Sequence, residues 1–290
     1  MRALHTARQR GFTLIEAIMV IVIIGILGAI VAVFIRAPIQ GYVDTVARAE
    51  ASDEADLALR RMARDIRLAL PNSVRVNAAG SAIEFLMTSS GGRYLAVEDE
   101  AASGTPLSFT DPAQTRFSVV GPLRQPVVPN RDFIAVFNLG LQDADAYAGN
   151  ALAPVSAVDT SNPNAPLITL ASNVFANQAA LLGTPMSSPD SRFQVVTGPV
   201  SFVCEAAAGG GFQIRRYAAY PIRAAQAVPP AGAQANMLAA RVTTCANVFR
   251  SDNVAATRAG LVVLTLSLRT RNLADPAVRL VHQVHIDNTP

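Results

Sequence analysis

The 290-residue sequence contains no lysine and no tryptophan, and it has only three histidines and two cysteines. We interpret the absence of lysine among 24 basic residues as a genomic bias and attach no function to it. No serine, cysteine or histidine has the neighbours that nucleophilic catalysis requires, and the cysteines lack the CxxC spacing typical of redox and metal sites. These absences predict a protein that is not an enzyme and that has no metal site and no cofactor.

Two further patterns could suggest a ligand, and neither has the required geometry. On a strand, His285 and Asp287 share one face while His282 points to the other, so the three residues make a poor metal triad. Gly209-Gly210-Gly211 precedes a predicted strand and not a helix. This position indicates a hairpin turn rather than a phosphate-binding loop.

An excess of positive charge is also missing once the position of each charge is considered. The formal net charge is +3, but Arg2, Arg8 and Arg10 all precede Gly11 in a segment without acids. The rest of the chain therefore holds 21 basic and 21 acidic residues. No basic surface is expected there, so the sequence predicts no nucleic-acid partner.

The most informative segment that is present runs from Phe12 to Ile35, where Glu16 is the only ionisable residue among 24. As a helix this segment is about 36 Å long, which is enough to cross the hydrocarbon core of a bilayer. A carboxylate in lipid costs about 2.5–3.5 kcal/mol at the centre of the bilayer and less towards the interface. We therefore expect Glu16 to have a partner of opposite charge.

Two interpretations of this N-terminus compete. A secretory signal peptide has a basic region, an apolar region and a small-residue cleavage site. Here the apolar run is too long, carries a carboxylate near its start, and leads into a charged helix instead of an Ala-x-Ala site. The alternative is cleavage before the apolar run, between Gly11 and Phe12, where a glycine lets a peptidase approach the backbone closely. We favour this second interpretation.

The box Gly-Phe-Thr-Leu-Ile-Glu at Gly11–Glu16 resembles the class III prepilin signal of type IV pilins and type II secretion pseudopilins. In that family prepilin peptidase removes the leader after the glycine, the new N-terminal Phe is N-methylated, and the glutamate is retained. Gly11, Phe12 and Glu16 match this pattern position by position. The resemblance implies a leader at residues 1–11, cleavage between Gly11 and Phe12, and methylation of Phe12.

The resemblance also implies partners and a location. Before assembly, pilin-type subunits are single-pass proteins of the inner membrane with a periplasmic head. At an inner-membrane assembly platform they then join other pilin or pseudopilin subunits through the N-terminal helix. The three arginines of the leader agree with this orientation, because positive charge favours the cytoplasmic side. We therefore expect a cytoplasmic leader, a periplasmic head and, finally, a place in a pilus or pseudopilus of a Gram-negative bacterium.

Cleavage would also supply a partner for Glu16. The new ammonium at Phe12 is costly in an apolar environment, and buried charges persist only when they are paired. Glu16 of one subunit could neutralise the amine of its neighbour, as the family resemblance suggests. A pair within one chain remains open, because Phe12 and Glu16 are four residues apart on a helix.

The two cysteines fit a periplasmic head. Cys204 and Cys245 would lie in an oxidising compartment, so we expect a disulfide between them. It would close a loop of roughly 40 residues and stabilise the fold by about 3–4 kcal/mol in the chain-entropy model. Two separate buried thiols are the alternative.

The N-terminal helix is expected to continue beyond the membrane. We predict a membrane-spanning or filament-core helix at 12–36 and an amphipathic periplasmic helix at 37–70, with a kink or local melting at Pro38. Pro71-Asn72 should end it. Apolar residues at three- and four-residue steps predict a stripe that packs on the head: Ala55, Leu59, Met62, Ile66 and Leu70.

Small residues share one face of the apolar half, and small residues let helix backbones approach each other closely. This pattern favours helix packing, although small residues are common in any membrane helix. The residues are Gly25, Gly28, Ala29 and Ala32.

The segment 71–290 is predicted to be a β-rich globular head, which makes the fold α+β with a long helix on antiparallel sheet. Short apolar or alternating runs separated by Gly, Pro, Asn and Asp indicate strands. Two pattern-poor segments, Asp143–Asp190 and Ala224–Gln234, are expected to be long surface loops. The predicted strands are Ser73–Val76, Ala82–Met87, Tyr94–Val97, Arg116–Val120, Phe133–Leu139, Arg192–Val196, Val200–Cys204, Phe212–Tyr217, Ala239–Cys245, Leu261–Arg269 and Val278–Ile286.

Three stretches of the head are similar to the MshO family of minor pilins, from the mannose-sensitive haemagglutinin (MSHA) pilus system: Phe133–Gly140, Asp145–Gly149 and Val278–Pro290. This resemblance implies a minor subunit that acts in pilus assembly, initiation or tip formation. The PilW minor pilins and the type II secretion pseudopilin J share the architecture and remain alternatives. A tip adhesin or DNA-uptake module is a further alternative, which the lack of a loop clustering aromatic and basic residues disfavours.

Overall fold

The computed structural model describes residues 11–99, 103–141, 143–182, 186–252, 259–271 and 276–289. The predictions for the leader arginines therefore lie outside the described residues. The chain divides into two units, Met1–Glu50 and Ala51–Pro290, each of which is described by itself.

One helix, α1, runs from Leu14 to Ile66 and continues through Pro38 without interruption. In the first unit every side chain from Phe12 to Ile35 is exposed. The helix is apolar all round in this segment, and a helix of that kind needs an apolar environment outside itself.

The helix ends at Ile66 and not at Leu70 as the sequence predicted, because its next residues pair with a strand. The amide of Leu70 donates to the carbonyl of Leu86, and the amide of Thr88 donates to the carbonyl of Leu68. The backbone of residues 68–70 therefore leaves the helix to satisfy its hydrogen bonds at the edge of the sheet.

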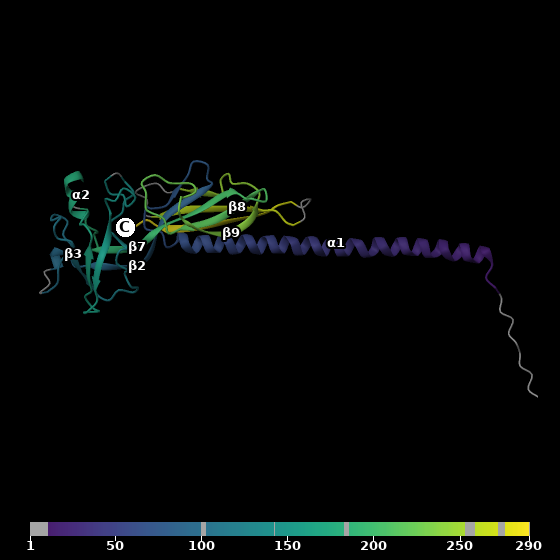
Figure 1. Cartoon of the computed structure of the whole chain (residues 1–290), viewed down its shortest axis with the longest axis horizontal. Helices are drawn as coiled ribbons and strands as arrows, with labels where there is room; N and C mark the ends of the chain where they lie inside the picture. The colour runs from purple at the N-terminus through teal and green to yellow at the C-terminus, as the bar shows by residue number, and fades with distance from the viewer. Residues whose placement is uncertain are drawn as a thin grey trace, which may run out of the picture. The chain divides into compact units, whose positions relative to one another are not determined.

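The second unit is built around two long strands, β2 (Ala82–Tyr94) and β7 (Arg192–Ala206). They pair antiparallel from Ala82 opposite Val203 to Arg93 opposite Arg192, with a register irregularity between Met87 and Ser90. All other strand pairs are antiparallel as well. The predicted α+β fold, a long helix followed by a large antiparallel sheet, is confirmed and is consistent with a pilin-like architecture (Figure 1).

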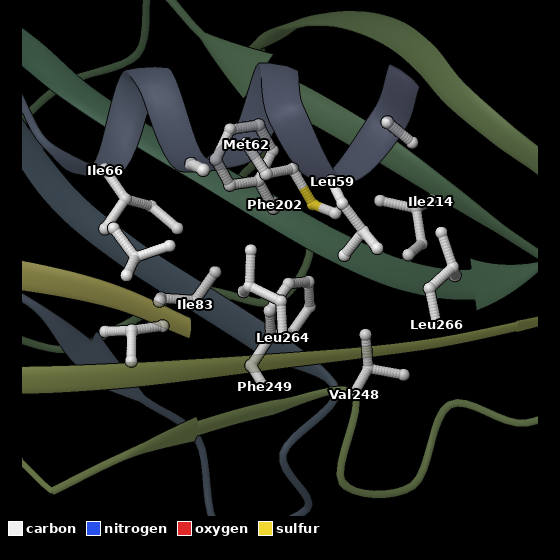
Figure 2. Close-up of a cluster of buried hydrophobic side chains, with 14 of the residues drawn as sticks. Leu59, Met62, Ile66, Ile83, Phe202, Ile214, Val248, Phe249, Leu264 and Leu266 are labelled. Atoms are coloured by element: carbon white, nitrogen blue, oxygen red, sulfur yellow. The ribbon is translucent and has the colours of Figure 1, made fainter. Parts of the chain in front are cut away.

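A first hydrophobic core lies between the part of α1 in this unit and one end of the sheet. Leu59, Met62 and Ile66 are at most 3% exposed and point from the helix towards Phe202 of β7 and the strands beyond it (Figure 2). Their spacing is the amphipathic stripe predicted from the sequence. The strands that complete this part of the sheet are β1 (Arg75–Val76), β8 (Phe212–Ala218), β9 (Gln234–Val242), β10 (Phe249–Ser251), β11 (Ala259–Leu268) and β12 (Val278–Asp287).

A second core lies inside a closed ring of strands at the other end of β2 and β7. The ring order is β2, β3, β6, β5, β4, β7 and back to β2. Phe117 packs edge-on against Phe193 there, with ring centroids 5.7 Å apart. Gly92 allows this packing, because a Cβ at that position would lie 2.7 Å from the Phe193 ring. The added strands are β3 (Arg116–Val120), β4 (Phe133–Ala135), β5 (Leu152–Asp159) and β6 (Leu167–Leu170).

The prediction that Asp143–Asp190 is one surface loop was wrong. The segment contains β5, β6 and an eight-residue helix, α2 (Phe175–Leu182). These elements are short, and β5 carries a proline and small residues, so the alternating pattern is faint. Pairing across the ring therefore determines their conformation more than local preference does. The prediction of a loop at Ala224–Gln234 is right except for Gln234, which begins β9.

Several predicted strands have different bounds in the structure. Arg192–Val196 and Val200–Cys204 belong to the single strand β7. Tyr94 is the last residue of β2, and a short 3-10 helix, η1 (Val97–Asp99), follows it. β4 keeps only the first three residues of Phe133–Leu139, because Phe137 and Gly140 turn the chain with positive φ angles.

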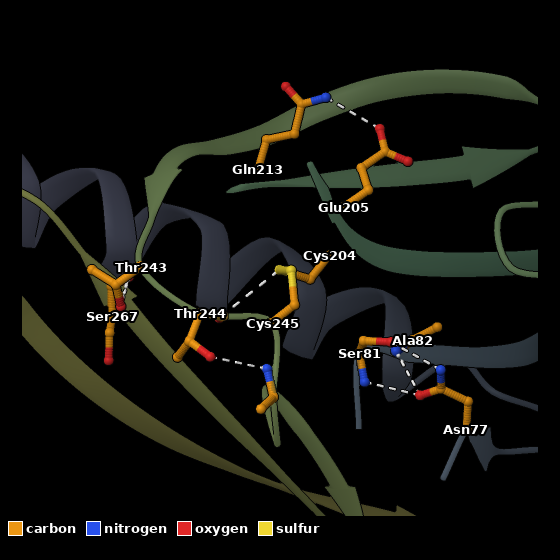
Figure 3. Close-up of a disulfide and its surroundings, with 11 residues drawn as sticks. Asn77, Ser81, Ala82, Cys204, Glu205, Gln213, Thr243, Thr244, Cys245 and Ser267 are labelled. Atoms are coloured by element: carbon orange, nitrogen blue, oxygen red, sulfur yellow. Dashed lines mark hydrogen bonds between the residues drawn. A yellow bond between two sulfur atoms is a disulfide. The ribbon is translucent and has the colours of Figure 1, made fainter. Parts of the chain in front are cut away.

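Cys204 of β7 and Cys245, which follows β9, form a disulfide with Cα atoms 5.3 Å apart (Figure 3). The residues are 41 positions apart in sequence. Cys204 is buried at the edge of the first core, with Cys245 packed beside it. The bond therefore ties the segment between β9 and β10 to the long strand that both cores share.

A buried ion pair lies near the start of the sheet. Glu84 of β2 is 2% exposed and accepts from Arg75 of β1 at 3.0 Å. Arg75 also donates to the carbonyl of Arg223 at 2.9 Å and lies 3.7 Å from the centroid of the Tyr147 ring. Burial raises the pKa of Glu84 above its usual value, and Arg75 only partly opposes this effect.

Removing the disulfide should destabilise the head without changing its fold. For the double variant Cys204→Ser with Cys245→Ser we expect the free energy of unfolding to fall by about 4 kcal/mol, from the loop-closure entropy of the 41-residue separation. Urea unfolding of the full chain in detergent measures this loss. A variant as stable as the unreduced parent would contradict the assignment of a stabilising role to the bond.

The buried Glu84 should give the stability a recognisable pH dependence. Its pKa is higher in the folded than in the unfolded chain, so its contribution to stability is present below pH 4.5 and is lost as the pH rises through the folded pKa. We expect Glu84→Gln to remove this decline from the profile of unfolding free energy against pH. Glu98→Gln, at an exposed position of η1, is the matched control. Profiles that coincide for the parent and Glu84→Gln would disprove the assignment.

Candidate functional site

The N-terminal box lies where α1 begins, and Thr13 caps the helix. The amides of Glu16 and Ala17 donate to the carbonyl of Thr13, both at 3.1 Å. The amide and the hydroxyl of Thr13 each donate to a carboxylate oxygen of Glu16 at 3.4 Å, and the amide of Glu16 also lies 3.4 Å from the Thr13 hydroxyl oxygen. Thr13 and Glu16 thus form a capping box.

This capping role was not predicted from the sequence, although the spacing Thr-x-x-Glu before an apolar run is its usual signal. Both bonds to the carboxylate are long, and Glu16 is exposed. A carboxylate in the first turn also interacts favourably with the helix dipole. Glu16 is therefore held at the start of the helix by weak local bonds that leave it open to a stronger partner.

Gly11 and Phe12 lie next to this cap and are accessible. The Phe12 side chain is 80% exposed, and a Cβ built at Gly11 would meet no atom within 4 Å. Because Gly11 is still bonded to Phe12, the nitrogen of Phe12 is an uncharged peptide nitrogen in this chain. Either pairing of Glu16 with that nitrogen, within one chain or between chains, would have to follow cleavage.

The face of small residues is open within the chain. A Cβ built at Gly25 or at Gly28 would meet nothing within 4 Å, and Ala29 and Ala32 are exposed. In the described part of the chain, α1 is the one helix with the length and composition of a membrane span, and its most apolar window has no buried residue.

The head offers little chemistry. Among the residues that the structure describes, no three His, Cys, Asp or Glu side chains are grouped so that they could hold a metal ion. His282 lies half-buried on the core side of β12, while His285 and Asp287 are exposed on the other side. This is the separation predicted from strand geometry.

A hollow of about 980 Å³ lies on β2 and β7 and is lined by three arginines. Arg93 and Arg192 face each other across the two strands, and each is paired with its own aspartate, Asp99 and Asp190. Arg124 adds the third positive charge. Because the opposing charges are largely balanced, this hollow does not form a charged binding site.

A family model described as the prokaryotic N-terminal methylation motif matches residues 6–32. No curated protein and no solved structure matches the chain. The matched segment contains the predicted cleavage box and most of the apolar run of α1, so it supports a type IV pilin-like prepilin protein. Proteins with this motif are structural subunits rather than enzymes, and the motif implies processing by prepilin peptidase and assembly with other pilins. The single apolar helix and the motif fit inner-membrane anchoring with a periplasmic head.

Proposed function

We propose that this chain is a filament subunit that prepilin peptidase cleaves between Gly11 and Phe12, methylates at Phe12, and releases for assembly through α1. The observation that carries the proposal is the fully exposed apolar segment from Phe12 to Ile35, which holds one carboxylate at its first turn. Such a segment is stable only in lipid or against other apolar helices.

In this proposal the leader arginines keep residues 1–11 on the cytoplasmic side, residues 12–36 span the inner membrane, and residues 37–70 and the head at 71–290 lie in the periplasm. After cleavage, the ammonium of Phe12 pairs with Glu16 of a neighbouring subunit when both leave the lipid, since two buried charges persist only as a pair. The face formed by Gly25, Gly28, Ala29 and Ala32 lets neighbouring helices approach closely.

The finer assignment is a minor subunit of an MSHA-type pilus that acts in assembly, initiation or at the tip. The similarity of three head segments to the MshO family supports it. The same architecture also suits a J-like pseudopilin of a type II secretion system. A tip adhesin or DNA-uptake module is the candidate from another class.

Deletion of the gene distinguishes these roles. Loss of filaments supports the assembly role, and loss of protein secretion supports the pseudopilin. Normal filaments that no longer attach to surfaces or take up DNA support the binding module.

Terminal mass spectrometry of the native protein should find N-methylated Phe12 as the first residue, and a chain that starts at Met1 or well beyond Ile35 would disprove the processing step.

Replacing Glu16 with Ala should separate membrane insertion from assembly. We expect cleavage and membrane retention to persist, whereas the amount of the subunit in sheared filaments should fall by at least about a hundredfold, because an unpaired buried charge costs about 3–5 kcal/mol. Quantitative immunoblots of membranes and filaments measure both quantities. Glu98→Ala in the head is the control, and normal incorporation of Glu16→Ala would refute the pairing.

A further inference from the structure

The part of α1 that covers the head carries a cluster of arginines on its outward side. Leu59, Met62 and Ile66 face the core, and at 100° per residue the cluster lies on the opposite side of the helix. All four arginines are exposed. We call them the arginine face: Arg60, Arg61 and Arg64 of α1, and Arg67 in the turn that directly follows it.

The arginine face is largely unneutralised. Arg60 pairs with Asp56 at 2.8 Å, and both side chains are mostly in solvent. The carboxylate of Asp65 is engaged by Arg216 of β8, also at 2.8 Å. Within the residues described, Arg61, Arg64 and Arg67 have no ion pair. Three positive charges therefore remain close together, on the last turns of α1 and in the turn that follows it.

This arrangement works against the stability of the isolated chain. Like charges three or four residues apart on a helix repel each other, as Arg61 and Arg67 do with Arg64. The helix dipole favours positive charge in the last turn, which accounts for Arg64 and Arg67 but not for Arg61. The face is also bordered by exposed apolar side chains, Leu57 at 52% and Leu68 at 46%. Arginine is enriched at protein interfaces relative to the rest of a protein surface.

The same side of the helix also carries the complementary charge. Asp53 is exposed, forms no ion pair with the described part of the chain, and precedes Arg64 by eleven residues. Eleven residues are about three helical turns and about 16 Å, so the two residues face nearly the same way. A second, parallel helix that is shifted by this distance brings its own Asp53 to the axial level of Arg64, where side chains of adjacent helices can reach each other. Because such a contact joins two different patches, it can repeat along an open filament.

We infer that the arginine face docks onto carboxylates on the outward helix face of a neighbouring pilin-type subunit. This inference rests on the proposed function and names the partner chemistry for the periplasmic half of α1. The guanidinium groups bind the carboxylates through charge-assisted hydrogen bonds, and Leu57 and Leu68 exclude water at the two ends. The contact sets the stagger between adjacent helices, whereas the apolar half supplies contact without charge.

Crosslinking in living cells identifies what occupies this face. A photoreactive amino acid replaces Leu68 in the full-length chain, and the adducts are analysed by mass spectrometry. We expect adducts with a subunit that bears the N-terminal methylation motif, including a second copy of this chain. Adducts with phospholipid, or the absence of any subunit adduct while the chain is present in filaments, would overturn the inference.

Charge reversal tests whether the contact depends on the arginines. The variant Arg61→Glu/Arg64→Glu/Arg67→Glu should enter filaments about tenfold less or worse, since three exposed ion pairs become repulsive. The matching lysine variant keeps the charge and should retain most of the incorporation. Arg279→Glu, on the exposed side of β12, is the control for an unrelated surface charge.

The outcomes distinguish this inference from the proposed function. Formation of the disulfide on a non-reducing gel shows that each variant has folded. If the parent chain is absent from filaments, the proposed function fails. If the parent and the glutamate variant are incorporated equally, the filament role stands and docking through the arginine face is refuted.

Discussion

The helix α1 must be stable in two environments, an apolar one around its first half and the surface of a β-sheet along its second half. The rest of the structure depends on this constraint. In its first half α1 exposes apolar side chains on every side. In its second half only the stripe containing Leu59, Met62 and Ile66 is apolar and buried, and the outward side is charged. The change of pattern along one uninterrupted helix separates the part that needs lipid or other helices from the part that a β-sheet covers. The head supplies that sheet.

Within the head, two strands organise everything else. β2 and β7 are paired over almost their whole length, and each contributes side chains to both hydrophobic cores: Phe85 and Phe202 pack with the helix, while Tyr94 and Phe193 lie inside the ring. The register irregularity between Met87 and Ser90 lies between the two sets. Bulges re-aim side chains and bend a strand, so they allow one strand pair to serve two cores. At the helix-covered end of this sheet, the disulfide links β7 to the segment after β9, and the Arg75–Glu84 pair links β1 to β2.

The sequence predicts the elements whose pattern is local. Such elements can be predicted because the spacing of apolar residues within each segment is regular. Examples are the stripe on α1, the strand Arg116–Val120 and the alternation at Val278–Ile286. β5 is not predicted, since Pro154 and several small residues weaken its alternation. β6 is only four residues long, and one of its two partners, β3, is remote in sequence. The sequence predicts that the helix ends at Leu70, whereas α1 ends at Ile66. The difference arises because the backbone of residues 68–70 forms hydrogen bonds with β2, which the sequence does not reveal. At the site, the box Gly11–Glu16 was readable from residue types, whereas the bond between Thr13 and Glu16 was overlooked.

The hydrogen bonds between Thr13 and Glu16 give the lone carboxylate of the apolar segment a role before cleavage. In the uncleaved chain Glu16 has a local task, since it accepts from the amide and hydroxyl of Thr13 at the helix start. Under the proposed processing, an ammonium then appears at Phe12, one residue before the cap. A charged donor is a stronger partner for a carboxylate than a neutral amide at 3.4 Å. Capping therefore holds Glu16 at the helix terminus while the chain is a precursor, and the weakness of the cap lets an amine displace it. Under the proposed function that amine belongs to a neighbour, because packing between subunits buries both charges together and buried charges persist only as a pair.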